Sequence, residues 1–117
     1  MKKLVFTLAM VFTLAGFAQQ EKPQLEQQGD VVKATYTNDK GAITQTGYFR
    51  DGKPHGEWVA YNDNGKEVAR ATYDEGKKVS TWFFWTDKHS LSEVEFVNNE
   101  VKNITKWSSV DALATNP

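Results

Sequence analysis

The chain has 117 residues and a formal net charge of −1, with 14 Lys and Arg against 15 Asp and Glu. A balance of this kind gives no electrostatic attraction to nucleic acid or to an anionic membrane surface. The chain contains no cysteine, which excludes a disulfide framework.

Residues 1–18 have the three-part layout of a secretory signal peptide. Two lysines precede an uncharged apolar run, and the segment ends in small residues, so we expect cleavage between Ala18 and Gln19. The alternative, a membrane anchor, fits less well because the run is shorter than the ~20 residues that span a bilayer. No cysteine follows the run, which excludes a lipid-anchored lipoprotein. We therefore predict an exported protein, periplasmic or secreted, with no integral membrane span after cleavage.

The mature chain is expected to hold 99 residues, 117 less 18, which suits one small domain. It keeps 12 of the 14 basic residues, because Lys2 and Lys3 leave with the signal peptide, for a net charge of about −3. Residues 19–30 are rich in Gln and Glu, lack periodicity and predict a flexible lead-in. The small, polar residues 108–117 predict a loose tail. The folded domain is then 31–107.

The domain has the pattern of an antiparallel β-meander. Short apolar and aromatic runs are separated by turn pairs of the Asn-Gly, Asp-Gly and Glu-Gly kind, which supply the positive φ angles of tight hairpins. No helical period follows the signal peptide. The predicted fold class is therefore all-β, with strands at 31–37, 42–50, 57–61, 68–74, 81–86, 91–97 and 101–107.

An internal repeat organises these strands. Residues 46–58 and 70–82 repeat each other, so that Trp58 aligns with Trp82, and a worn third copy ends at Trp107. The separation of Trp58 and Trp82 along the chain defines the repeat period. Such a unit cannot bury its apolar face alone, so neighbouring copies must stack into an extended structure. This architecture favours binding or scaffolding.

The repeat resembles the variant MORN repeat, whose pattern runs aromatic, x, x, Gly, Lys, x, x, Gly, x, Trp, then an aromatic residue and a further Gly-Lys turn. The resemblance covers about 60 residues. It departs from the pattern at Ser80, where the motif has its second Gly, and in the third copy, which lacks the turn glycines. The matching positions are Phe49, Gly52, Lys53, Gly56, Trp58, Tyr61, Gly65, Lys66, Tyr73, Gly76, Lys77, Trp82 and Trp85.

What the resemblance implies is an antiparallel sheet of stacked β-hairpins that is used for protein or membrane contacts. Some members of the family are exported or described as antitoxins, with no established activity. We accordingly expect a non-catalytic binding or structural module whose partner is an unknown protein or a second copy of itself. An antitoxin-like or immunity-type inhibitor of a partner protein is the alternative.

One short stretch of sequence suggests an enzyme as a further alternative. GYFRDGKPHGEW, at 47–58, resembles the Gly-x-Phe-Asp-Pro-x-His-x-Gly-His signature of nucleotidyltransferases such as nicotinate mononucleotide adenylyltransferase. That signature uses two His to hold a triphosphate, whereas here Glu57 follows Gly56 and no second His is near. A meander also lacks the alternating strands and helices of a nucleotide-binding sheet. We therefore predict no catalytic residues.

Two histidines, His55 and His89, are the only ones in the chain, and both fall at predicted turns. A metal site needs three or four converging ligands. The sequence therefore predicts no metal site and no cofactor.

Side-chain alternation assigns the two faces of the sheet. If Asn64-Gly65 and Glu75-Gly76 are two-residue turns, residues 63 and 66 pair, as do 74 and 77. One face then collects large rings opposite small residues, among them Gly47, Ala71 and Ser80. It predicts a structural ladder of Phe49, Trp58, Tyr73, Trp82, Phe84 and Phe96.

The opposite face mixes apolar and charged side chains and is the candidate contact face. We expect an apolar patch rimmed by Arg70, Glu93 and Glu95, because such patches on exported domains often mark contact surfaces. The alternatives are that residues 19–30 or the tail fold over it, or that sheet twist wraps it into a second small core. The candidate contact residues are Val59, Tyr61, Val68, Arg70, Phe83 and Trp85.

Overall fold

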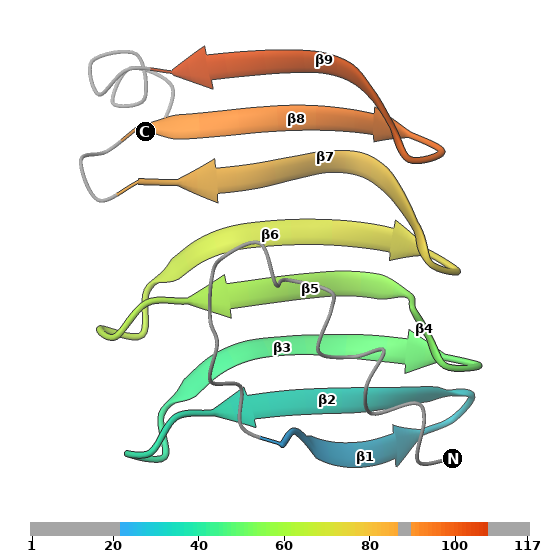
Figure 1. The fold of residues 1–117 in the computed structure, drawn as a ribbon, viewed down its shortest axis with the longest axis vertical. Coiled ribbons are helices and arrows are strands. Elements are labelled where there is room, and N and C mark those ends of the chain that lie inside the picture. Colours follow the sequence, from blue (N-terminus) through green and yellow to red (C-terminus); the bar gives the residue numbers. More distant parts are fainter. Residues whose placement is uncertain (1–21, 87–89, 108–117) are drawn as a thin grey trace.

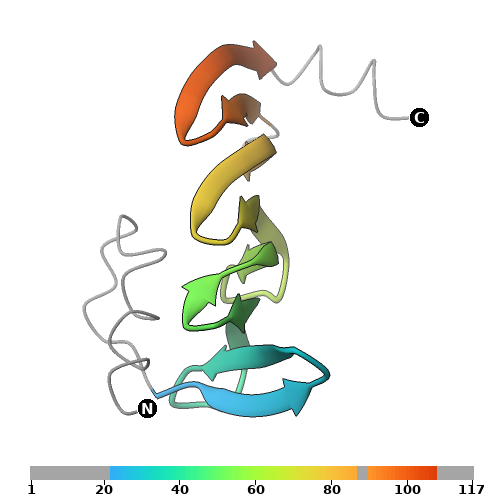
Figure 2. The same ribbon diagram turned by 90° about the vertical axis from the view of Figure 1, so that its right-hand side faces the viewer.

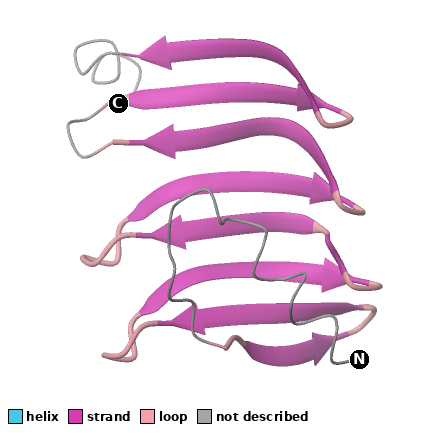
Figure 3. Ribbon diagram, viewed as in Figure 1, coloured by secondary structure: helices cyan, strands magenta, loops and turns pink. Residues whose placement is uncertain are grey.

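The computed structural model describes residues 22–86 and 90–107, all of them in strands and short connections (Figure 3). The predicted signal peptide, 1–18, and the predicted tail, 108–117, lie outside the described residues. The strands are β1 Gln24–Gln28, β2 Val31–Thr37, β3 Ile43–Arg50, β4 Lys53–Pro54, β5 Gly56–Tyr61, β6 Glu67–Asp74, β7 Lys77–Trp85, β8 Leu91–Val97 and β9 Glu100–Trp107.

All of these strands belong to one antiparallel sheet. Its order is β1-β2-β3-β5-β6-β7-β8-β9, with the short β4 paired to β3, so the chain runs from one edge to the other without a crossover (Figure 1). Turned by 90°, the strands stack one above another in a single layer (Figure 2). The all-β antiparallel meander is confirmed. Within the described ranges there is no helix with the length and apolar character needed to cross a membrane.

The flexible lead-in predicted at 19–30 is wrong over 24–28, which form β1. This strand pairs with β2 along its whole length, with Leu25 opposite Ala34. All five of its side chains are exposed, so the sequence carries no alternation to mark it. Backbone hydrogen bonds along β2 and the reversal at Gly29, φ 67°, hold β1 at the sheet edge.

Of the two predicted two-residue turns, one is present and the other is not. Asp74 pairs with Lys77 as expected for a two-residue turn at 75–76, so β7 starts four residues before the strand predicted at 81. The turn predicted at 64–65 is wrong, because the loop is longer. Asn62 closes it by donating its backbone N–H to the Lys66 carbonyl at 2.9 Å.

Each long loop is organised by one polar side chain. Asn62 Oδ1 accepts the backbone N–H of Asn64 at 2.9 Å and of Lys66 at 3.0 Å. Asn38, one repeat period earlier, accepts from the backbones of Lys40 and Ala42 at 2.9 and 3.0 Å. Thr86, one repeat period later, accepts from Ser90 at 3.3 Å. The Asx-type loop at Asn38 therefore recurs one period later at Asn62.

A second repeated feature, a shift in strand pairing, lies at the ends of the hairpins opposite the Asn38 and Asn62 loops. Between β3 and β5 the pairing shifts by two residues, and Gly56 there has φ 89°. Between β6 and β7 the pairing also shifts by two, and Ser80, the equivalent residue, has φ 64°. A shift of two leaves every side chain on its original face. The face assignment therefore survives, although the register around Ser80 differs from the predicted one.

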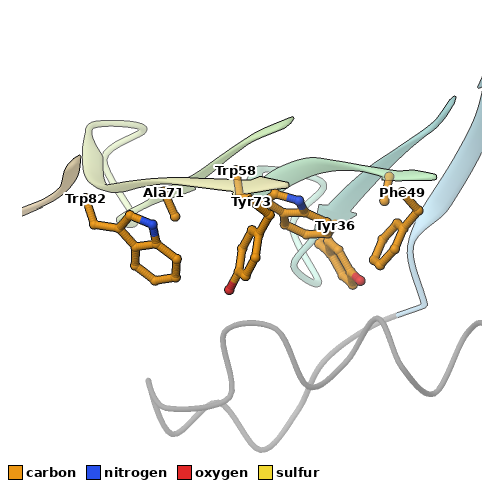
Figure 4. Packing of buried hydrophobic residues seen from close by; sticks show 7 residues of the cluster. Tyr36, Phe49, Trp58, Ala71, Tyr73 and Trp82 are labelled. Atoms are coloured by element: carbon orange, nitrogen blue, oxygen red, sulfur yellow. The ribbon is translucent and has the colours of Figure 1, made fainter. Parts of the chain in front are cut away.

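The structural ladder is confirmed as the core. Trp58, Trp82, Phe49 and Tyr73 are 0, 4, 5 and 6% exposed, and all project from the same side of the sheet (Figure 4). Phe84 and Phe96 are half-buried and pack against the end of this cluster. Ser80 is exposed, and its predicted place among the small residues of the core is wrong because the positive φ moves it out of the regular pleat.

The core rings meet mainly edge to face. Centroids are 4.9 Å apart for Phe49 and Trp58, and 5.2 Å for Tyr73 and Trp82. Trp82 also contacts Phe96 at 4.9 Å. Edge-to-face pairs of this kind add about 0.5–1.5 kcal/mol each beyond their buried area.

The tryptophans are fixed by equivalent hydrogen bonds. Trp58 Nε1 donates to the Tyr48 carbonyl at 3.1 Å, and Trp82 Nε1 donates to the Thr72 carbonyl at 3.1 Å. The Trp58 ring occupies the space that a Cβ on Gly47 would need. Each indole thus lies across the neighbouring strand, over a small residue.

Truncating a ladder tryptophan tests the core assignment. We expect Trp82→Ala to lower the free energy of unfolding by about 3–5 kcal/mol, because it removes a buried ring that contacts Tyr73, Phe84 and Phe96. Chemical denaturation followed by circular dichroism measures the loss. A variant that melts within a degree or two of wild type contradicts the assignment.

The strain at Ser80 predicts a stabilising change. A non-glycine residue at φ 64° carries a left-handed backbone, so we expect Ser80→Gly to raise the free energy of unfolding by about 0.5–1 kcal/mol. Ser80→Val should lower it, because a β-branched side chain is poorly tolerated there. Thermal unfolding of both variants gives the comparison, and the reverse order of melting temperatures would refute the strain argument.

Alkaline pH tests the burial of the ladder tyrosine. Burial raises the pKa of Tyr73 to about 12, above its ordinary value of 10, and also raises the pKa of Tyr36. Between these two pKa values the unfolded chain ionises Tyr73 and the folded chain does not. The contribution of the neutral, buried Tyr73 to the free energy of unfolding is therefore complete below about pH 10 and is lost as the pH rises toward 12. At pH 11 the loss from Tyr73 is about 1.4 kcal/mol. Tyr73→Phe should therefore lose less stability than wild type between pH 8 and pH 11; equal losses contradict the prediction.

Candidate contact face

The second face of the sheet, the one opposite the ladder, is defined by its cross-strand pairs. One row of paired positions crosses six strands from β3 to β9, and the side chains of paired residues share a face. Its members are Thr46, Val59, Arg70, Phe83, Glu93 and Thr105. Three of the six predicted contact residues are therefore aligned in one row.

Arg70 lies at the centre of this row. Its Nη1 is 2.7 Å from Glu57 Oε2, and its Nε and Nη2 reach Glu67 at 2.6 and 2.8 Å. The hydrogen bonds to Glu67 first, and then to Glu57, raise the pKa of the Arg70 guanidinium further above its ordinary value. Two carboxylates around one guanidinium leave a net charge of −1 and hold the planar fork in place.

Arg70 divides the apolar patch that was predicted to be continuous. It pairs with Val59 on one side and with Phe83 on the other, so it stands inside the patch and not at its rim. The alternation argument places Arg70 on the correct face. It misses the register, which depends on the two-residue shift near Ser80.

The aromatic half of the face consists of Phe83 and Trp85. Their rings are stacked, with centroids 5.8 Å apart and an interplanar angle of 18°, and both are half-buried. On β5, on the other side of Arg70, Val59 is buried at 8% exposed and Tyr61 is half-buried, and Val68, on β6 with Arg70, is also half-buried. Two apolar lobes therefore flank a fixed charge cluster.

Trp107 also belongs to this face, although the sequence pattern did not predict it there. Its Nε1 donates to Glu93 Oε2 at 3.1 Å, and it pairs with Leu91, which pairs with Trp85. The repeat period would place it with Trp82 on the ladder. The β8–β9 register shifts by one residue near Phe96, however, and a shift of one moves all later side chains to the opposite face. The available signal is that Trp107 comes one position later than the period requires.

Residues 24–28 do not cover the second face, because they extend the sheet as β1 beside β2. One of the two covering segments considered from the sequence is thereby excluded over those residues. The other, 108–117, lies outside the described residues.

The histidine turn has a structural contact. His55 Nδ1 accepts the backbone N–H of Glu75 at 3.0 Å and lies 3.8 Å from Asp74 Oδ1, so it joins two neighbouring turns. The Pro54 carbonyl accepts the N–H of Gly76 at 2.8 Å beside it. His89 lies outside the described residues. Among the side chains that the structure describes, no three His, Asp or Glu come close enough together to hold a metal ion.

The chain was compared with models of known protein families and with curated proteins, and neither comparison gives a match. The geometry of the second face is therefore the basis for assigning a function.

Proposed function

We propose that this protein is an exported, non-catalytic β-repeat module of the variant MORN type that binds a protein partner through its second face. The observation that carries the proposal is the stacked Phe83–Trp85 pair on β7, with Phe83 paired to Arg70 on β6, all partly exposed on a continuous sheet. The periodic recurrence of loops and indole hydrogen bonds supports the repeat assignment.

The composition of this surface supports the proposed binding role. Tyr, Trp and Arg are the residues that contribute most to protein–protein affinity, and they act from well-ordered positions with little entropy left to lose. Arg70 is held by two carboxylates and Trp85 by its stack on Phe83, so both are ordered before a partner arrives.

The large side chains of the second face are less buried than those of the ladder. On the ladder side, Trp58 and Trp82 are nearly inaccessible, and both indole N–H groups are used by the backbone. On the second side the large side chains keep part of their surface. A single-layer sheet separates the two tasks by parity alone, since successive side chains point to opposite faces.

Trp85→Ala tests the proposal. We expect the variant to keep the melting temperature of wild type within a few degrees while its capture of a partner from the cell envelope falls about 30-fold, which corresponds to ~2 kcal/mol for a central aromatic residue. Quantitative pull-down with tagged full-length protein gives the capture, and circular dichroism gives the melting temperature. Thr46→Ala, on the same face but on β3, is the matched control and should bind as wild type does.

Two results would contradict the proposal. If Trp85→Ala unfolds as badly as Trp82→Ala, then Trp85 is part of a second core. If it folds and captures as much partner as wild type, the stacked pair is not the binding site.

A further inference from the structure

Both edges of the sheet end in exposed apolar side chains. Within the described residues, β1 pairs only with β2, and β9 pairs only with β8. Leu25 on β1 is 47% exposed, and Val101 and Ile104 on β9 are 53 and 55% exposed. An unpaired strand with apolar side chains is a template for pairing with another chain.

Leu25 and Ile104 are the two ends of one row that crosses the ladder face. Its interior members are buried or half-buried, because each has a neighbour on both sides. Leu25 and Ile104 each have a paired neighbour on one side only. The row runs through Leu25, Ala34, Gly47, Trp58, Ala71, Trp82, Val94 and Ile104, with Ala71 and Trp82 joined through the core cluster where the β6–β7 pairing shifts.

The strand count makes the two edges complementary. Eight strands follow one another along the sheet path, all antiparallel, so β9 runs opposite to β1. A second copy placed with its β1 beside β9 therefore continues the antiparallel alternation. If Leu25 of that copy lies opposite Ile104, the apolar row continues on the same face into the second sheet.

Charge selects this pairing over the symmetrical one. Two β9 strands aligned at Ile104 would place Lys102 opposite Lys106 twice, and like charges directly opposite one another are destabilising. β1 carries one charge, Glu26, which in the β1–β9 register lies opposite the neutral Asn103. The lysines of β9 thus act against β9–β9 pairing and leave the acidic β1 as the compatible partner.

We propose that the β9 edge of one molecule binds the β1 edge of a second copy of this chain, with Ile104 opposite Leu25. The contact is heterologous, so it propagates head to tail, and it lengthens both faces of the sheet. It uses a surface separate from the second face and does not depend on the function proposed above.

A complementation experiment tests this edge pairing. Sedimentation velocity of the purified mature chain across a concentration series should show association that increases with concentration. Ile104→Lys spoils only the β9 edge, and Leu25→Lys spoils only the β1 edge, so each variant alone should be monomeric. An equimolar mixture should form dimers and nothing larger, because one intact edge remains on each variant.

Control variants keep the result specific. Val97→Lys, at another exposed apolar residue, should associate as wild type does, and Trp85→Ala should do the same because it changes the second face. Circular dichroism should show all variants folded, since the residues changed to Lys are about half exposed. A monomeric wild type, association by Leu25→Lys alone, or a mixture that stays monomeric would each overturn the proposal.

Discussion

The fold depends on an indole ring that crosses from its own strand onto the next. Trp58 lies over Gly47 and donates to the Tyr48 carbonyl, and Trp82 makes the equivalent bond to Thr72, one repeat period on. The described strands form a single-layer sheet, and among them apolar area is buried by side chains that lie along the sheet's own surface. Large rings over small residues do this, and the hydrogen bond removes the cost of an unpaired N–H.

The second constraint is the alternation of side chains along each strand, because this alternation alone decides which face of a one-layer sheet a residue lies on. Gly56 and Ser80 absorb shifts of two residues, which preserve the faces while changing the register. The shift of one in β9 reverses them and brings Trp107 to the face of Trp85. Backbone irregularities such as these therefore help decide which rings lie on the ladder face and which lie on the second face.

The sequence predicts the fold class, most strand positions and the ladder, because these follow from alternation and from the repeat period. It does not predict β1, whose side chains are all exposed, or the loop at Asn62, where a side chain and not a turn pair closes the reversal. For the candidate site it predicts the face of Arg70 and Trp85 correctly. It misses the place of Arg70 between Val59 and Phe83 and the contribution of Trp107, because both depend on register shifts that leave little mark on composition.

The last repeat changes both surfaces of the molecule through a single irregularity. In this copy Ile104, the residue equivalent to Gly56 and Ser80, has no positive φ, and β9 pairs with a one-residue shift that places Trp107 on the second face. The ladder side of β9 is then left with Val101 and Ile104, too small to cover the sheet as an indole does, and both stay exposed. The same departure from the period thus adds Trp107 to the aromatic side chains beside Glu93 and leaves apolar side chains exposed on β9, so the final hairpin contributes less to the core than the earlier ones do.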